Sequence, residues 1–244
     1  MRSLLRLSSP PVFFQFAGRL MPLLLLAGLA LFAVGSYGAL FTTPPDAVQG
    51  DVYRAIYVHV PTAWMSMFLY TVATGYAVLH WLYKTDVSAV MMRAFLPLGA
   101  WMTLVALITG SLWGKPTWGT YWVWDARLTS ELLLLFIYLG LMALNGMVDD
   151  ETKVDRVLAV AMVVGLVNIP LIYFSVIYWN TLHQGMTFGS GGNRMAPEMR
   201  QALLFCVLGV WLLCAGLVLK RARWMLVARC EHAQWARNAI NGGV

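Results

Sequence analysis

Long runs without a charged residue alternate with short charged segments along this chain of 244 residues. The uncharged runs cover residues 20–45, 55–83, 94–114, 132–148, 157–193 and 201–219. A helix needs about 20 mainly apolar residues to cross the hydrocarbon core of a bilayer, and a chain in lipid must satisfy its backbone hydrogen bonds internally. The pattern therefore predicts six membrane-spanning helices, near residues 20–41, 61–83, 91–112, 129–148, 157–179 and 202–220.

Composition agrees with this pattern. Hydrophobic residues make up 60% of the chain and charged residues 11%, against roughly 25% charged residues in an average soluble domain. We find no internal repeat and no low-complexity tract. The sequence thus predicts an all-α integral membrane protein with a single membrane domain over residues 1–244.

The distribution of Lys and Arg predicts the orientation. Twelve of the 17 basic residues fall in the amino-terminal tail, the second and fourth loops and the carboxyl tail, and five fall in the first, third and fifth loops. Because positive residues are retained on the cytoplasmic side, both termini are expected there and the odd-numbered loops outside. The net charge of +6 needs no nucleic-acid partner, since it is concentrated beside the membrane, where the carboxyl tail can meet anionic lipids.

The third loop is unusually rich in tryptophan. It begins with the sequence WGKPTWGTYWVWDARLTS, which contains Trp113, Trp118, Trp122 and Trp124. One or two such rings are typical of a membrane-interface belt, whereas four form a platform that can stack on a large planar ligand. Pro116 can open a short helix in which Trp118, Trp122 and Asp125 recur at helical spacing. We therefore expect a short amphipathic segment on the outer surface, between the third and fourth spans.

Two of the four histidines are expected on the same side as this loop. His59 is placed in the first outer loop, just before the Pro61 predicted to open the second span, and His183 lies in WNTLHQG after the fifth span. A single histidine at a membrane boundary is usually an interfacial residue. Two of them beside an aromatic platform favour a site for heme, whose iron is bound by imidazole.

Charged side chains complete this predicted site. Asp125 and Arg127 stand at the edge of the platform, and heme propionates need cations such as the forked guanidinium of arginine. The candidate cations of the outer loops are Arg54, Lys115, Arg127 and Arg194. The chain has no C-x-x-C-H motif, so heme b would be held without covalent bonds. It has no G-x-x-x-x-G-K-[ST] loop either, so any ATPase activity must belong to a partner.

The stretch WGKPTWGTYWVWDARLTSELLLLF, with YVHVP around His59 and WNTLHQG around His183, closely resembles the signature of the cytochrome c maturation protein C family. These are tryptophan-rich, heme-handling proteins of the bacterial inner membrane, and the resemblance covers nearly the whole chain. It implies that heme is presented at the outer, periplasmic face, with His59 and His183 as iron ligands, and is passed to a periplasmic heme chaperone for cytochrome c biogenesis. It also implies a complex with ATP-binding cassette ATPase and permease subunits and a small single-span subunit.

Two other classes of protein remain as alternatives. A heme-containing redox subunit, such as a quinone-linked diheme cytochrome, would hold hemes between helices, but the paired histidines here support at most one heme. A permease subunit would show ionisable groups within the membrane. We find only Glu131, which can simply favour the start of the fourth span, and we expect Asn168 and Pro170 to kink the fifth span. The remaining tryptophans are assigned to interface belts or packing: Trp64, Trp81, Trp101, Trp179, Trp211 and Trp224.

Overall fold

The computed structural model describes residues 6–147, 150–179, 181–183 and 195–242. Every regular element among them is helical. In chain order these are α2 (Pro10–Tyr37), the π-helical turn η1 (Gly38–Thr42), the 3₁₀ turn η2 (Asp51–Ala55), α3 (Ile56–Tyr83), α4 (Asp86–Ala94), α5 (Leu96–Trp118), α6 (Ala126–Met147), α7 (Glu151–Gly165), α8 (Asn168–Tyr178), α9 (Pro197–Arg229) and α10 (Gln234–Asn241).

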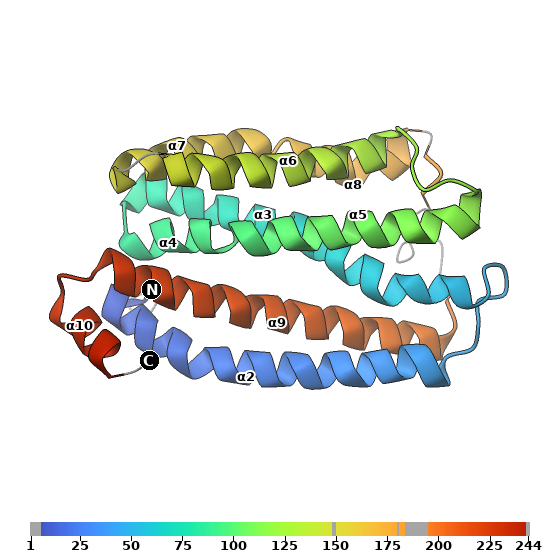
Figure 1. Cartoon of the computed structure of the whole chain (residues 1–244), viewed down its shortest axis with the longest axis horizontal. Helices are drawn as coiled ribbons and strands as arrows, with labels where there is room; N and C mark the ends of the chain where they lie inside the picture. The colour runs from blue at the N-terminus through green and yellow to red at the C-terminus, as the bar shows by residue number, and fades with distance from the viewer. Residues whose placement is uncertain (1–5, 148–149, 180, 184–194, 243–244) are drawn as a thin grey trace.

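The helices run lengthwise in one bundle (Figure 1). Helices α2 and α9 pack along each other as one side of it, and α5, α6, α7 and α8 form the other. Helix α3 crosses between them and contacts α4, α5, α7 and α9. The two ends of the chain lie at the same end of the bundle, beside α10 (Figure 1).

Five helical segments in the described part of the chain are long and apolar enough to cross a membrane, namely Pro10–Thr42, Asp86–Trp118, Ala126–Met147, Glu151–Tyr178 and Pro197–Arg229. They correspond to five of the six predicted spans. The remaining one corresponds to α3, which is 28 residues long but is not among these segments. Its buried face includes polar side chains such as Ser66, Thr74 and His80, as suits a helix surrounded by other helices. A sixth span therefore stays a prediction.

The helices begin and end differently from the predicted spans. Helix α2 begins at Pro10, and α5 continues through Pro116 to Trp118. The predicted helix opening at Pro116 was wrong. Helix α5 ends because Gly119 adopts a left-handed conformation with φ of 87°, which glycine adopts without steric cost. Residues 119–125 are not helical, so the tryptophans beyond Gly119 do not follow helical spacing.

The expected kink in the fifth span is confirmed. Helix α7 ends at Gly165 and α8 begins at Asn168, two residues before Pro170, whose ring cannot continue the hydrogen-bond ladder. The Asn168 side chain donates a hydrogen bond to the carbonyl of Ser130 in α6 (2.9 Å). This bond holds α8 against α6 on the side where the two histidines lie.

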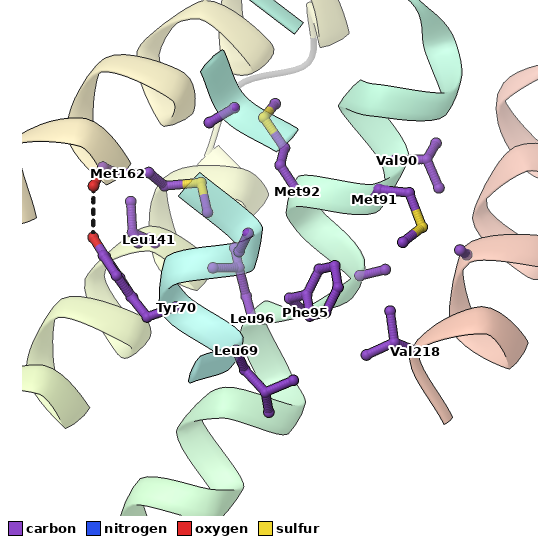
Figure 2. Close-up of a cluster of buried hydrophobic side chains, with 14 of the residues drawn as sticks. Leu69, Tyr70, Val90, Met91, Met92, Phe95, Leu96, Leu141, Met162 and Val218 are labelled. Atoms are coloured by element: carbon purple, nitrogen blue, oxygen red, sulfur yellow. Dashed lines mark hydrogen bonds between the residues drawn. The ribbon is translucent and has the colours of Figure 1, made fainter. Parts of the chain in front are cut away.

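A buried cluster fixes α3 at the centre of the bundle (Figure 2). The ring of Tyr70 is fully buried, and its hydroxyl donates to the carbonyl of Met162 in α7 (3.1 Å). Around it pack Leu69, Leu96 and Leu141 from three different helices. Because α3 is fixed here, its first turn holds a defined place relative to α5 and α6.

Charged side chains join the helices at the end of the bundle that carries the termini. Arg229 of α9 contacts Asp86 of α4 (2.8 Å) together with Glu151 (3.1 Å) and Asp155 (2.9 Å) of α7. Arg93 of α4 also contacts Asp155 (2.5 Å), whose carboxylate is almost completely buried. Removing one partner of a buried ion pair of this kind strongly destabilises a fold. They fix α4, α7 and α9 relative to one another.

Candidate functional site

A cavity of about 640 Å³ lies at the end of the bundle opposite the termini. Its walls come from α3, α5, α6, α8 and α9, with the non-helical segments around Trp122 and His183. On α3 the lining residues recur three or four apart from Ile56 to Thr71, so one face of the helix forms a wall. The volume falls in the range of roughly 300–1,000 Å³ that is typical of small-molecule sites.

His59 lies in the first turns of α3, whereas the sequence analysis placed it in a loop. That placement was wrong because η2 leads directly into α3, and Pro61 lies inside the helix. The hydroxyl of Thr62 donates to the carbonyls of Val58 (2.9 Å) and His59 (3.0 Å). These bonds add a side-chain contact to the backbone of the helical turn that contains His59 and Pro61. His59 is therefore held by regular backbone.

The surroundings of His59 fix the orientation of its ring. Nδ1 lies 3.0 Å from the carbonyl of Ala106 and 3.2 Å from the hydroxyl of Thr109, which itself donates to another carbonyl. A carbonyl can only accept, so in the neutral imidazole Nδ1 carries the proton and Nε2 carries the lone pair. A Cβ added to Gly110 would lie 2.9 Å from Cε1 of the ring, so only glycine leaves room for it there. Nε2 is thus prepared to bind a metal.

The structure brings His183 to the same cavity. The centroids of the His59 and His183 rings are 6.0 Å apart, and the ring planes are inclined by 40°. Two imidazoles on opposite sides of one metal, with bonds of roughly 2 Å, place their centroids about 6 Å apart. The pair therefore has the spacing that two ligands to one metal would have.

Three of the four clustered tryptophans line the cavity: Trp113, Trp118 and Trp122. Trp113 is held by a hydrogen bond from its Nε1 to Gln49 (2.7 Å), and its ring meets that of His59 edge-on, 5.7 Å away. The Nε1 atoms of Trp118 and Trp122 are buried and have no hydrogen-bond partner among the described residues. Trp124 is 77% exposed and is not among the described lining residues. Three of the predicted platform rings are thus half-buried walls of one cavity, and the fourth lies outside it.

Arg127 and Glu131 bring charge into this apolar space. Arg127 is the one Lys or Arg among the described residues that line the cavity, and its guanidinium donates to the carbonyl of Ile172 in α8 (2.8 Å). Glu131, one helical turn further along α6, is 7% exposed and accepts a hydrogen bond from Ser66 (2.7 Å). Both groups lie within the bundle, where ionisable side chains are usually functional.

The other charged candidates are used elsewhere. Arg54 donates to Asp51, Thr43 and the carbonyl of Ala39, which ties η2 to η1 and to the residue that follows η1. It is not among the described lining residues. Asp125 accepts from the backbone N–H of Leu128 (2.8 Å), as the N-terminal cap of α6, and from the Thr181 hydroxyl. Lys115 donates to the carbonyl of Gly119 (3.1 Å). Arg194 lies outside the described residues.

Three residues that line the cavity were assigned other roles from the sequence. Glu131 was assigned to a helix dipole, and Trp64 and Trp211 were assigned to belts or packing, yet all three line the cavity. Trp211 of α9 stacks on Phe68 of α3 with centroids 5.1 Å apart and an angle of 7°. The spacing of four residues from Arg127 could have indicated Glu131. No sequence signal indicates Trp211, because α9 reaches the cavity only through tertiary packing.

Known proteins resemble this chain over almost its whole length. The family model described as "Heme exporter protein C" matches residues 3–237. The heme exporter protein C of Escherichia coli K12 is 39% identical over 98% of this chain and 97% of its own. That of Bradyrhizobium diazoefficiens is 40% identical over 93% of this chain and 86% of its own. A putative cytochrome c biosynthesis ccmC-like mitochondrial protein of Marchantia polymorpha is 43% identical over 69% of this chain and 72% of its own. This chain is a multi-pass membrane protein that belongs to the heme exporter protein C family.

Proposed function

We propose that this protein binds heme b non-covalently in the cavity, with His59 and His183 as the two axial ligands of the iron, and delivers it to a periplasmic heme chaperone for cytochrome c biogenesis. Heme is cargo in this proposal, so the site must both hold and release it. The observation that carries the proposal is the pair of imidazoles facing one apolar cavity with centroids 6.0 Å apart.

The ligand set favours heme over a bare metal ion. Zinc and other divalent metals generally take three or four protein ligands. No group of three or more His, Cys, Asp and Glu side chains that could hold a metal occurs in the described residues. Two histidines are sufficient for heme, because the porphyrin itself supplies four nitrogens to the iron. The tryptophan walls then cover the flat faces and edges of the macrocycle.

Further contacts fit a porphyrin carboxylate. Arg127 has guanidinium N–H groups beyond the one that donates to Ile172, and arginine binds carboxylates through its planar fork. The indole N–H groups of Trp118 and Trp122 are buried beside the cavity and offer two more donors. The hydrogen bond at Nδ1 of His59 makes its Nε2 a more basic ligand, as outer-sphere acceptors do for metal-bound histidines.

The placement in the membrane is part of the same proposal. We infer six spans, with α3 as the one surrounded by the others, both termini in the cytoplasm and the cavity end of the bundle at the periplasmic face of the inner membrane. ATP-binding cassette ATPase and permease subunits and a small single-span subunit would complete the complex. ATP hydrolysis would belong to the ATPase, since this chain has no phosphate-binding loop.

The test is an absorption spectrum of the purified protein, produced with and without heme supply, followed by transfer of heme to the chaperone. We expect a Soret band with the sharp visible bands of low-spin heme. His59→Ala and His183→Ala should each remove most of the transfer, and the double variant should be little worse, because two ligands of one iron act as a unit. His232→Ala is the control, since His232 is an exposed residue of the carboxyl tail.

Three outcomes would count against the proposal. A wild-type protein without a Soret band would refute heme binding. Near-normal transfer by the double variant would refute the two-ligand site. A stable low-spin heme that is never passed to the chaperone would favour a heme-containing redox subunit instead.

A further inference from the structure

Three hydrogen bonds connect His183 to the tryptophan-rich segment. One oxygen of the Asp125 carboxylate accepts from the backbone N–H of Leu128 (2.8 Å), and the other accepts from the hydroxyl of Thr181. The same hydroxyl oxygen accepts from the backbone N–H of His183 (3.1 Å). A continuous path of polar contacts thus runs from the first turn of α6 to the backbone of His183.

The two histidines differ in how their backbones are supported. His59 lies in α3, whereas His183 follows α8, which ends at Tyr178, and residues 181–183 are not helical. Outside a helix, a backbone N–H often donates to the hydroxyl oxygen of a nearby threonine, and this bond fixes the local conformation. The Thr181 hydroxyl fixes the backbone of His183 in this way and joins it to another part of the chain.

The far end of this path is firmly placed. Asp125 caps α6, and a capping carboxylate is held by the backbone N–H groups at a helix start. Helix α6 is in turn joined to α8 by Arg127, which donates to Ile172, and by Asn168, which donates to Ser130. The segment of His183 is thereby positioned against the same helix end that follows Trp122 and Trp124 in the sequence.

We infer that Thr181 is a positioning residue for His183, which acts with Asp125 to hold the second iron ligand opposite His59. This inference rests on the proposed function, because it assumes that His183 binds iron. It also gives Asp125 a role that its position in the sequence did not suggest. The carboxylate does not contact the cavity but sets the distance between the tryptophan wall and the His183 segment.

The experiment compares Thr181→Val, which keeps the size of the side chain and removes the hydroxyl, with Thr181→Ser, which keeps the hydroxyl. In Thr181→Val the heme should lose its second ligand, so the low-spin six-coordinate spectrum should change to a high-spin five-coordinate one. Heme loss to an acceptor such as apomyoglobin should become roughly 10- to 100-fold faster, the range for removing a hydrogen bond to a charged group. Thr181→Ser should keep the wild-type spectrum and rate.

A second variant and a heme-free measurement complete the test. Asp125→Asn keeps a good helix cap but removes the charge that Thr181 contacts, so it should shift the spectrum in the same direction. Combined with Thr181→Val it should add little, since the two residues act on one contact. In the heme-free protein, hydrogen exchange at the His183 amide should be faster in Thr181→Val than in Thr181→Ser.

The outcomes separate this inference from the proposed function. A wild-type protein that binds no heme refutes the proposed function, and the amide exchange then decides whether the contact exists. A wild-type protein that binds low-spin heme while Thr181→Val and Asp125→Asn keep its spectrum and rate overturns the positioning role. If Thr181→Val does not accumulate in membranes, an unchanged spectrum in Asp125→Asn overturns it alone.

Discussion

Replacing Gly110 by alanine should weaken heme binding without disturbing the fold. The new Cβ would lie 2.9 Å from Cε1 and 3.3 Å from Nδ1 of His59, whereas carbon atoms in contact are normally about 3.5–4.0 Å apart. The imidazole would therefore have to move by at least about 0.6 Å. Its Nδ1 is held 3.0 Å from the carbonyl of Ala106, and a shift of that size lengthens this contact beyond a normal hydrogen bond.

The magnitude follows from these two effects. Overpacking of this kind typically costs about 1–3 kcal/mol, and a lost hydrogen bond costs about 1 kcal/mol. If about 1–3 kcal/mol of this cost is lost from the free energy of heme binding, the affinity for heme falls roughly 5- to 150-fold. Gly75→Ala is the matched control in α3, because a Cβ at Gly75 meets nothing within 4 Å. It should leave heme affinity unchanged and stabilise the helix slightly.

The assay is a heme titration of purified, heme-free protein, followed by the Soret band. Gly110→Ala should bind more weakly, and its spectrum should show altered ligation at His59. Added to His59→Ala, the substitution should cause no further loss, because its effect passes through that ring. The reasoning is refuted if Gly110→Ala binds heme as tightly as the wild type with the same spectrum.

Three more predictions concern the membrane topology, the cavity wall and the charged end of the bundle. A single cysteine at Thr120 should react with a membrane-impermeant thiol reagent added from the periplasmic side, and one at Thr152 should not; the reverse labelling would invert the orientation. Trp118→Ala with Trp122→Ala should lower heme content, because each stacked aromatic pair contributes about 0.5–1.5 kcal/mol to binding, and the remaining heme should keep a histidine-type spectrum. Unchanged heme content would assign both rings to packing. Asp155→Ala should lower the free energy of unfolding by about 3–5 kcal/mol, because it leaves buried arginine charge without its partner, while the heme spectrum stays normal; detergent or thermal denaturation of heme-free protein measures this, and an unaltered midpoint would contradict it.

The hydrophobic runs predicted six spans, and five of them match helical segments that are long and apolar enough to cross a membrane, because length and apolarity are local properties of a sequence. Prediction was poorer where a proline was interpreted as the start of a helix. Pro61 and Pro116 were interpreted as helix starts, yet both lie inside helices. Helix α3 continues on both sides of Pro61, and at Pro116 helix α5 continues for two more residues until Gly119 ends it. Neither continuation follows from the identity of the proline itself.

The candidate site was predictable in part, for a related reason. Residue type and order along the chain indicated His59, His183 and three of the four tryptophans of the third loop. They could not indicate Trp211, whose place in the cavity depends on how α9 packs against α3. The hydrogen-bond partners of the charged side chains could not be predicted from the sequence either. Nothing in the sequence shows that the guanidinium of Arg54 is used on η1 and Thr43, away from the cavity.

The charged contacts around Asp155 join α4, α7 and α9 at one end of the bundle. His80 of α3 lies 4.0 Å from this carboxylate, and His59 lies 21 residues earlier on the same helix, about 32 Å away. If the contact of Tyr70 with α7 moved with the helix, α3 would act as a lever about the end of the bundle that carries the termini. A partner that tilts it by about 2° would move His59 by about 1 Å, half the length of a metal–imidazole bond of roughly 2 Å. Release of the cargo would then need no unfolding, only a small rotation about a pivot that the chain already contains.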